Sequence, residues 1–264
     1  MSHYQYLLTS VEDGVGILQL NHLEKRNALG WELHHEIIAA LDAWIEDDTV
    51  SCVLFIGNED IFCGGWALDV LNGVTGDQLR RFNDLALKFM HKVYDYGKPT
   101  VCAVAGMAPG YGMDVANMCD VTVASENAHF GSTQVKYGMN GFYGGMQRKC
   151  GPMRARKLFF TGDAINAQEA HRIGLVDELV PVGGLRARAL ALAKQIAEMG
   201  PELAVVMKRI ALRAQNMDHI GGLTFELEVE HDLLQRGLFR ERITAGYKKL
   251  KEGQSRAIER IASK

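Results

Sequence analysis

The chain has 264 residues, of which 47% are hydrophobic and 23% charged, and its formal net charge is −3. This composition is typical of a globular protein, and the length fits one large α/β domain or a core with a small appendage. No apolar run approaches the ~18 residues that span a bilayer, and no basic block is present, so we expect neither a membrane nor a nucleic-acid partner. Residues 1–10 contain no export signal, so we expect a cytoplasmic protein.

The cysteines predict neither disulfide bonds nor a metal site. They are Cys52, Cys63, Cys102, Cys119 and Cys150. Their number is odd, no C-x-x-C pair occurs, and most lie in apolar runs, so we expect free buried thiols. The adjacent histidines, His34 and His35, would not share a helix face, and we therefore expect no metal ligands.

Apolar runs alternate with helical spacing through the first half of the chain. In chain order, the pattern predicts a strand at 15–20, a helix at 31–45, a strand at 52–56, a helix at 77–94, a strand at 100–105, a helix at 111–119 and a strand at 121–124. Apolar strands that alternate with helices favour a parallel or mixed sheet covered by helices, which is an α/β fold.

Beyond Gly151 the pattern becomes nearly all helical. Asn166 and Glu169 have the spacing of a capping box, and Gly174 follows as a helix stop. The stretch 221–264 is charged, periodic and free of proline. We therefore expect a sheet-containing core at 1–200 and a helical region at 201–264.

Three glycine-rich segments could carry chemistry, at 62–69, 106–114 and 138–145. A glycine turn before a helix leaves backbone N–H groups unpaired, and two such turns can direct donors at one developing oxyanion. The alternative is that they are only tight connections. Their order differs from that of a nucleotide-binding loop, and no G-x-S-x-G motif of a serine hydrolase is present.

Several segments together resemble the crotonase superfamily, which contains enoyl-CoA hydratases, isomerases and their relatives. They occur in the family's order at 23–29, 62–69, 98–106, 117–120, 128–131, 144–148 and 161–176. The resemblance implies a spiral of ββα units with a C-terminal helical trimerisation region, and hence a homotrimer or a dimer of trimers. It also implies an acyl-CoA thioester substrate, with coenzyme A as part of that substrate and no separate cofactor.

The resemblance assigns catalytic positions. The two backbone N–H groups of the family's oxyanion hole fall on Trp66 and Tyr111, whose large side chains should reshape the acyl pocket. The two carboxylates of the hydratases fall on Asp114 and Gln134, and the carboxylate position of the isomerase and dehalogenase branches falls on Phe142. Asp114 is thus the one acidic group in these positions. Because no second carboxylate there raises its pKa by repulsion, we expect it to act mainly as a base or to position water.

Six residues are candidates for substrate contact. They are Lys25, Arg26, Ala28, Gly64, Leu68 and Tyr143. The family's adenine pocket maps to backbone around Ala28 and Gly64, and Lys25 or Arg26 could meet a phosphate. Tyr143 could act as an acid.

Three functions remain open from the sequence. The first is hydratase or isomerase chemistry through a thioester enolate, on an unusual acyl group such as a cyclic or aromatic one. The second is decarboxylation, or formation or cleavage of a carbon–carbon bond, on a coenzyme A thioester, which Gln134 favours. The third is a non-catalytic acyl-CoA-binding or assembly protein that kept the fold.

Overall fold

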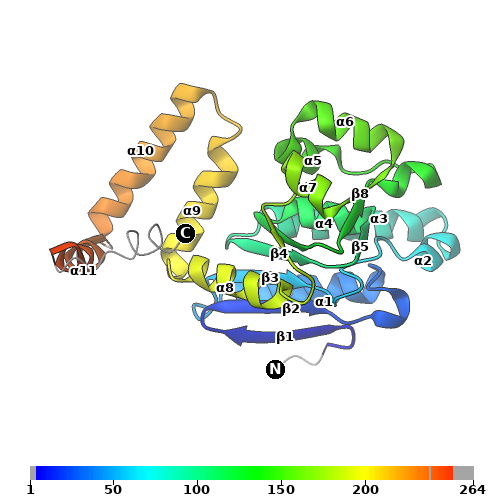
Figure 1. Cartoon of the computed structure of the whole chain (residues 1–264), viewed down its shortest axis with the longest axis horizontal. Helices are drawn as coiled ribbons and strands as arrows, with labels where there is room; N and C mark the ends of the chain where they lie inside the picture. Colours follow the sequence, from blue (N-terminus) through cyan, green and yellow to red (C-terminus); the bar gives the residue numbers. More distant parts are fainter. Residues whose placement is uncertain (1–3, 238, 252–264) are drawn as a thin grey trace. The chain divides into compact units, whose positions relative to one another are not determined.

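A computed structural model describes residues 4–237 and 239–251 of the chain (Figure 1). The chain forms two compact units, Met1–Lys208 and Arg209–Lys264. The first unit contains a six-stranded sheet and a three-stranded sheet. Among the described residues, none of the helices combines the length and the apolar character that crossing a membrane requires.

The larger sheet has the order β1-β2-β3-β4-β6-β9. Its strands are β1 (Leu7–Glu12), β2 (Val15–Leu20), β3 (Cys52–Ile56), β4 (Thr100–Val104), β6 (Val121–Ser125) and β9 (Glu178–Val180). β1 pairs with β2 in antiparallel register, and every other pair is parallel. Every residue of β3 and β4 is buried, as expected for central parallel strands that have helices on both faces.

The smaller sheet has the order β5-β7-β8 and lies next to the site described below. Its strands are β5 (Met107–Pro109), β7 (His129–Gly131) and β8 (Ala164–Asn166). β5 runs directly into α4 (Tyr111–Met118), so this sheet fixes the start of that helix. Two 3-10 helices, η1 (Leu23–Lys25) and η2 (Thr133–Tyr137), lie in the connections.

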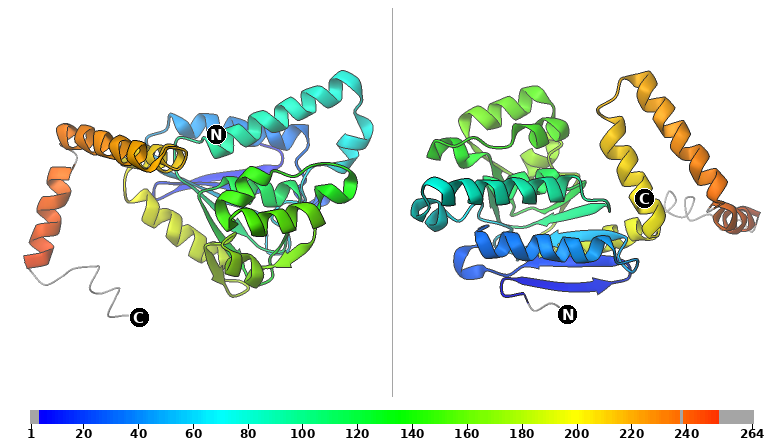
Figure 2. Two further views of the ribbon diagram at one scale, coloured as in Figure 1. Left: turned by 90° about the horizontal axis from the view of Figure 1, so that it is seen from above. Right: turned by 180° about the vertical axis from the view of Figure 1, so that it is seen from behind.

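Helices cover both faces of the larger sheet. α1 (Trp31–Ile45) contacts β1 and β2, and α8 (Leu185–Ala197) contacts β2, β3, β4 and β6. The other helices up to residue 214 are α2 (Leu68–Gly73), α3 (Gly76–Tyr94), α5 (Tyr143–Cys150), α6 (Pro152–Thr161), α7 (Ala167–Ile173) and α9 (Pro201–Ala214). α1 and α3 run side by side, and their apolar sides belong to the larger core cluster (Figure 2). α8 covers the other face with alanines at every fourth position, and these small side chains let the helix lie close to β3 and β4.

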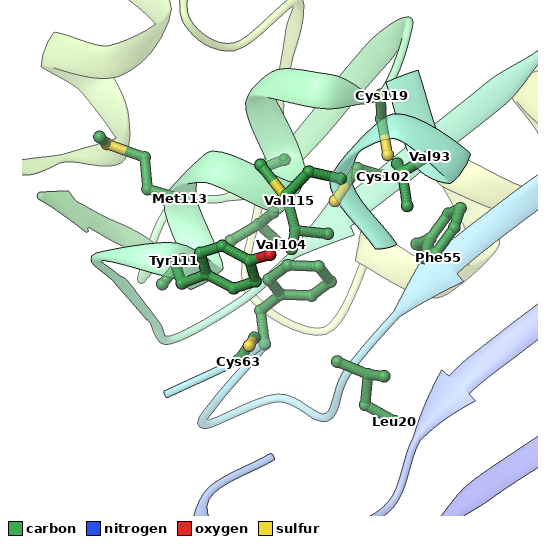
Figure 3. Packing of buried hydrophobic residues seen from close by; sticks show 14 of the residues in the cluster. Leu20, Phe55, Cys63, Val93, Cys102, Val104, Tyr111, Met113, Val115 and Cys119 are labelled. Atoms are coloured by element: carbon green, nitrogen blue, oxygen red, sulfur yellow. The ribbon is translucent and has the colours of Figure 1, made fainter. Parts of the chain in front are cut away.

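Alternate residues of the central strands β3 and β4 enter the two core clusters. Phe55 and Cys102 belong to the larger cluster, and Figure 3 shows Cys102 close to Val115 of α4 and Phe55 on the side of Val93. Their neighbours along the strands pack under α8. The period of two along each strand therefore divides the core between the faces.

The second unit is helical where it is described, with α10 (His219–Arg236) and α11 (Phe239–Lys251). The side chain of Asp218 caps α10 by accepting a hydrogen bond from the N–H of Gly221 at 2.8 Å. α10 leaves Ile220, Leu223 and Leu227 exposed at spacings of three and four residues, which is one helix face.

The predicted α/β fold and its seven elements are confirmed, and no end of a predicted element differs from the structure by more than one residue. The chain beyond Gly151 is mostly helical where it is described, as the pattern predicts, but it also contains the three-residue strands β8 and β9, which the pattern does not indicate. The cap at Asn166 is confirmed, since its side chain accepts a hydrogen bond from the N–H of Glu169 at 2.9 Å. All five cysteines are free and buried, as predicted.

Candidate active site

Two glycine turns contact each other backbone to backbone. Gly65 has φ of +90°, and a Cβ atom placed there would lie 3.0 Å from the Pro109 carbonyl oxygen and 3.4 Å from the Tyr111 nitrogen. On the other side, a Cβ atom on Gly112 would lie only 2.2 Å from the Cys63 carbonyl oxygen. Any larger residue at either glycine would separate the turns, so these glycines bring the loop before α2 against the start of α4.

The close approach places two backbone donors at one cavity. Trp66 and Tyr111 both line a cavity of about 110 Å³. Among the residues that the structure describes, neither backbone N–H donates a hydrogen bond. Tyr111 is the first residue of α4, where an N–H group is free and the helix dipole favours negative charge.

The cavity is formed by three segments: the loop before α2, the start of α4, and η2 with the loop that follows it. Its lining residues are Gly64, Gly65, Trp66, Leu68, Pro109, Gly110, Tyr111, Thr133, Gln134, Tyr137, Met139, Asn140 and Phe142. The fold thus brings together five of the candidates predicted from the sequence, from positions up to 70 residues apart: Gly64, Trp66, Leu68, Tyr111 and Gln134.

Asp114 is a completely buried carboxyl group in the first turn of α4. It is not itself one of the cavity-lining residues, but it contacts Gln134, which does line the cavity. Its Oδ2 atom accepts a hydrogen bond from Nε2 of Gln134 at 2.5 Å. Its Oδ1 atom is buried and has no hydrogen-bond partner in the part of the chain that is described. The carboxyl group therefore keeps one oxygen free.

Burial raises the pKa of Asp114 to about 7, although the hydrogen bond from Gln134 and the backbone amide of Phe142 act in the opposite direction. The sequence indicates only that no second carboxylate raises this pKa by repulsion, and the cause found here is burial instead. At neutral pH the group therefore populates both its protonated and its ionised form. The role of Asp114 as a base or as a water-positioning group stays a prediction.

Gln134 lies in η2 and is almost completely buried. Its Nε2 atom contacts Asp114, and its Oε1 atom has a long contact of 3.4 Å with the Ser132 hydroxyl, which leaves acceptor capacity on the amide oxygen. A side chain at Gly141 would displace this hydroxyl, since its Cβ atom would lie 2.5 Å from Ser132 Oγ.

Aromatic rings surround the cavity. The Tyr111 hydroxyl donates a hydrogen bond to the Ala86 carbonyl oxygen at 2.8 Å, and burial raises its pKa, so this group is not available to transfer a proton. The Trp66 ring packs against Tyr111 at 5.1 Å and against Phe82 at 5.7 Å, measured between ring centroids. The Phe142 ring packs edge-on against Tyr111 at 5.7 Å.

The remaining candidates lie outside the cavity. Lys25 is half-exposed and forms an ion pair with Asp69 at 2.5 Å. Arg26 is exposed, and its carbonyl oxygen accepts a hydrogen bond from the N–H of Gly64 at 2.8 Å. Ala28 is half-buried on the same loop. Tyr143 is not among the cavity residues, and its hydroxyl donates to the Pro152 carbonyl oxygen at 3.3 Å.

The sequence reasoning missed Asn27, which is completely buried at φ of +54°. Its side chain accepts a hydrogen bond from the N–H of His22 at 2.8 Å and donates one to the Phe62 carbonyl oxygen at 3.1 Å. Asn27 thereby holds the loop with Lys25 and Arg26 against the glycine turn. An asparagine in a polar loop gives no signal of this contact, because its partner lies 35 residues away.

Known proteins share both the sequence and the fold. The family described as Enoyl-CoA hydratase/isomerase matches residues 10–254. The crotonyl-CoA hydratase of Syntrophomonas wolfei is 32% identical over 212 residues, which cover 79% of this chain and 81% of that protein. The 2,3-dehydroadipyl-CoA hydratase of Escherichia coli K12 is 31% identical over 226 residues, covering 84% and 88%.

Solved structures of similar sequence give the same result. The enoyl-CoA hydratase of Bacillus anthracis superposes with a TM-score of 0.88 at 27% identity, over 95% of this chain and 97% of that one. The strand order and the helical second unit described above are thus those of an enoyl-CoA hydratase fold. The chain belongs to the enoyl-CoA hydratase/isomerase family.

Proposed function

We propose that this enzyme hydrates short 2-enoyl-CoA thioesters through an enolate, with Asp114 as its single acid–base group. The observation that carries the proposal is the Asp114 carboxyl group, buried, with a pKa of about 7 and one oxygen without a partner. A group whose pKa lies near the working pH is best suited both to take and to give a proton.

The proposed oxyanion hole consists of the backbone N–H groups of Trp66 and Tyr111. Both are unused by the described residues, and both residues line the cavity. In the reaction they would donate to the thioester oxygen as it gains negative charge, and the start of α4 would add the favourable end of its dipole. The large side chains do not interfere with this role, because the donors belong to the backbone.

The proton transfer needs only one carboxylate. The oxygen of a water molecule bonds to the β-carbon while one of its protons passes to Asp114, and the enolate then takes a proton from Asp114 at the α-carbon as the carbonyl re-forms. The free lone pair of Gln134 Oε1 would hold the water, while Nε2 of the same amide holds the carboxylate.

The size of the cavity supports a short acyl group. An apolar protein cavity of roughly 150 Å³ accepts benzene. The cavity here is smaller, at about 110 Å³. This favours a short chain over the cyclic or aromatic acyl group that the bulky donor positions suggested.

Coenzyme A would bind as part of the substrate, with no separate cofactor. The loop with Lys25, Arg26 and Ala28 is fastened to Gly64 by the hydrogen bond from Gly64 N–H, which places two cations near the cavity. Lys25 would have to break its ion pair with Asp69 to bind a phosphate. Because both side chains are exposed, this ion pair contributes little free energy and its loss costs little. We also propose that the chain assembles as a trimer or a dimer of trimers.

A second reaction is favoured by one observation, the amide at position 134. Decarboxylation, or formation or cleavage of a carbon–carbon bond next to the thioester, needs the oxyanion hole and one proton donor but no activated water. In that case protonated Asp114 would deliver its proton to the α-carbon of the enolate. The two reactions therefore require opposite protonation states of the same group.

The decisive experiment combines a variant with a pH profile. Asp114→Asn should lower kcat by roughly 10²-fold or more with little change in KM, because it removes proton exchange and keeps the shape. Gln134→Ala is the comparison, and it should alter affinity or product choice more than proton transfer. For hydration, kcat/KM of the wild type should rise as the pH increases through about 7, where Asp114 ionises.

A fall of activity through the same pH range would instead support the decarboxylation class. If Asp114→Asn retains nearly full activity, Asp114 is only a residue at the start of a helix. If the wild type exchanges no α-proton of a bound acyl-CoA with deuterated water, the chain is a binding protein.

A further inference from the structure

Phe142 is shared by three cavities. It lines the cavity of about 110 Å³ described above, a larger one of about 690 Å³ beside α3, and a third of about 180 Å³ between α3 and α5. The first two cavities have four lining residues in common: Trp66, Met139, Asn140 and Phe142. The small cavity is therefore separated from much larger space by a thin layer of side chains.

The Phe142 side chain can be removed from this layer without touching the proposed catalytic groups. Its ring is half-buried and packs on the Tyr111 ring, whereas its contribution to the Asp114 carboxyl group comes from the backbone amide. Trp66 offers less separation, because its ring packs against both Tyr111 and Phe82. Phe142 is thus the residue at which the partition can be tested by itself.

The space beyond the partition suits an alkyl chain. The larger cavity is lined along α3 by Leu79, Ala86 and Leu87, with Arg80 and Asn83 beside them. The smaller third cavity adds Met90 and Met118, both apolar. A chain that passed Phe142 would lie along the half-exposed apolar side chains of Leu79 and Leu87, and the third cavity also has His91 and Arg148 in its lining.

We propose that the Phe142 ring sets the upper length of the acyl group by closing the small cavity toward the space along α3. This inference rests on the proposed function, and it names a residue that determines which thioesters the enzyme accepts. In the wild type, a chain longer than the small cavity has to displace the ring from its packing on Tyr111.

The expected effect follows from the hydrophobic transfer of methylene groups. Each methylene that gains an apolar environment strengthens binding roughly fourfold, equal to about 0.8 kcal/mol. Four additional methylenes, from butyryl to octanoyl, therefore give at most a change of roughly two orders of magnitude. Because part of the opened space is polar and solvated, we expect a gain of about tenfold or more rather than this limit.

The test measures binding of saturated acyl-CoAs, which need no turnover. Isothermal calorimetry with butyryl-, hexanoyl-, octanoyl- and decanoyl-CoA would compare the wild type with Phe142→Ala and with Phe142→Leu, a milder variant that preserves more packing. Phe160→Ala is the matched control, since Phe160 is exposed on α6 and lines none of the three cavities. kcat/KM for the matching 2-enoyl-CoAs would be measured in parallel.

The inference is supported if wild type and Phe160→Ala prefer butyryl- or hexanoyl-CoA while Phe142→Ala prefers octanoyl-CoA, with Phe142→Leu between them. It is overturned if the dependence on chain length is the same in all four proteins, or if the wild type already binds decanoyl-CoA as well as butyryl-CoA. If none of the four proteins binds any of the thioesters, both this inference and the proposed function are refuted. If all bind alike without turnover, the inference fails and the binding alternative stands.

Discussion

Replacing Asp114 by asparagine should make the protein more stable at neutral and alkaline pH while it abolishes proton transfer. The folded state holds this carboxyl group away from water and raises its pKa from the ordinary value of 3.8 to about 7. A raised carboxyl pKa adds stability below the unfolded-state value, and this stability is lost as the pH rises through the folded-state value. The wild type should therefore lose stability between about pH 4 and pH 7.

The magnitude follows from the linkage between protonation and folding. One pKa unit corresponds to about 1.36 kcal/mol, so the full cost of ionising Asp114 in the folded state is about 4 kcal/mol. Between pH 5 and pH 8 the wild type should lose about 2.5 kcal/mol of unfolding free energy relative to Asp114→Asn. For a chain of this size, the change corresponds to a difference in Tm of roughly 5 to 10 °C.

The assay is urea unfolding of both proteins at pH 5 and at pH 8. Comparing the two pH values removes any constant cost of the asparagine, such as a buried amide N–H without a partner, which costs about 1–3 kcal/mol. Asp163→Asn is the control, because it removes an exposed carboxylate and should follow the wild type. Equal stability differences between wild type and Asp114→Asn at both pH values would refute the reasoning, since the carboxyl group would then be solvated in the folded state.

Two further predictions concern the backbone donors and the assembly. Gly65→Ala should lower kcat/KM by roughly 10²–10³-fold, because the new Cβ atom would lie 3.0 Å from Pro109 O and would displace the Tyr111 N–H. The control is Gly183→Ala, which is also at positive φ but has no atom within 4 Å of the new Cβ and should leave turnover unchanged. Equal losses in both variants would contradict the proposed oxyanion hole. Sedimentation at micromolar concentration should show a trimer or a hexamer, because α10 leaves a row of apolar side chains exposed, and a monomer would contradict the proposed assembly.

Hydrophobic periodicity predicted the long helices and strands, because the buried positions of each element are the apolar positions of its sequence. β3 and β4 are continuous apolar runs, and α1 places its apolar residues at helical spacing. β1 was not predicted, because of its residues only Leu7 is buried and the strand has no alternation to read. The three-residue strands β8 and β9 are held by pairing to distant strands, which no local pattern reports.

The candidate site was predictable in its members but not in its chemistry. The glycine turns and the resemblance placed Trp66, Tyr111, Asp114 and Gln134 near one another. The direct contact between Asp114 and Gln134, 20 residues apart, and the loss of water around the carboxyl group required the fold. From the sequence, Phe142 is notable only because it stands where some family branches have a carboxylate. Its position between the cavities depends on the packing of three helices.

The five free cysteines can serve as natural probes of local unfolding in the core. Only the thiolate reacts with alkylating reagents. Burial raises the pKa of Cys52 and of Cys63 to about 12, and burial also raises the pKa of Cys102 well above its ordinary value. A reagent can therefore label one of these residues only after the surrounding element has opened. Cys63 lies in the turn before Trp66, Cys102 in a central strand and Cys150 at the end of α5. The order in which they are labelled would give the order in which the glycine turn, the sheet and the outer helices come apart, without any probe being introduced into the chain.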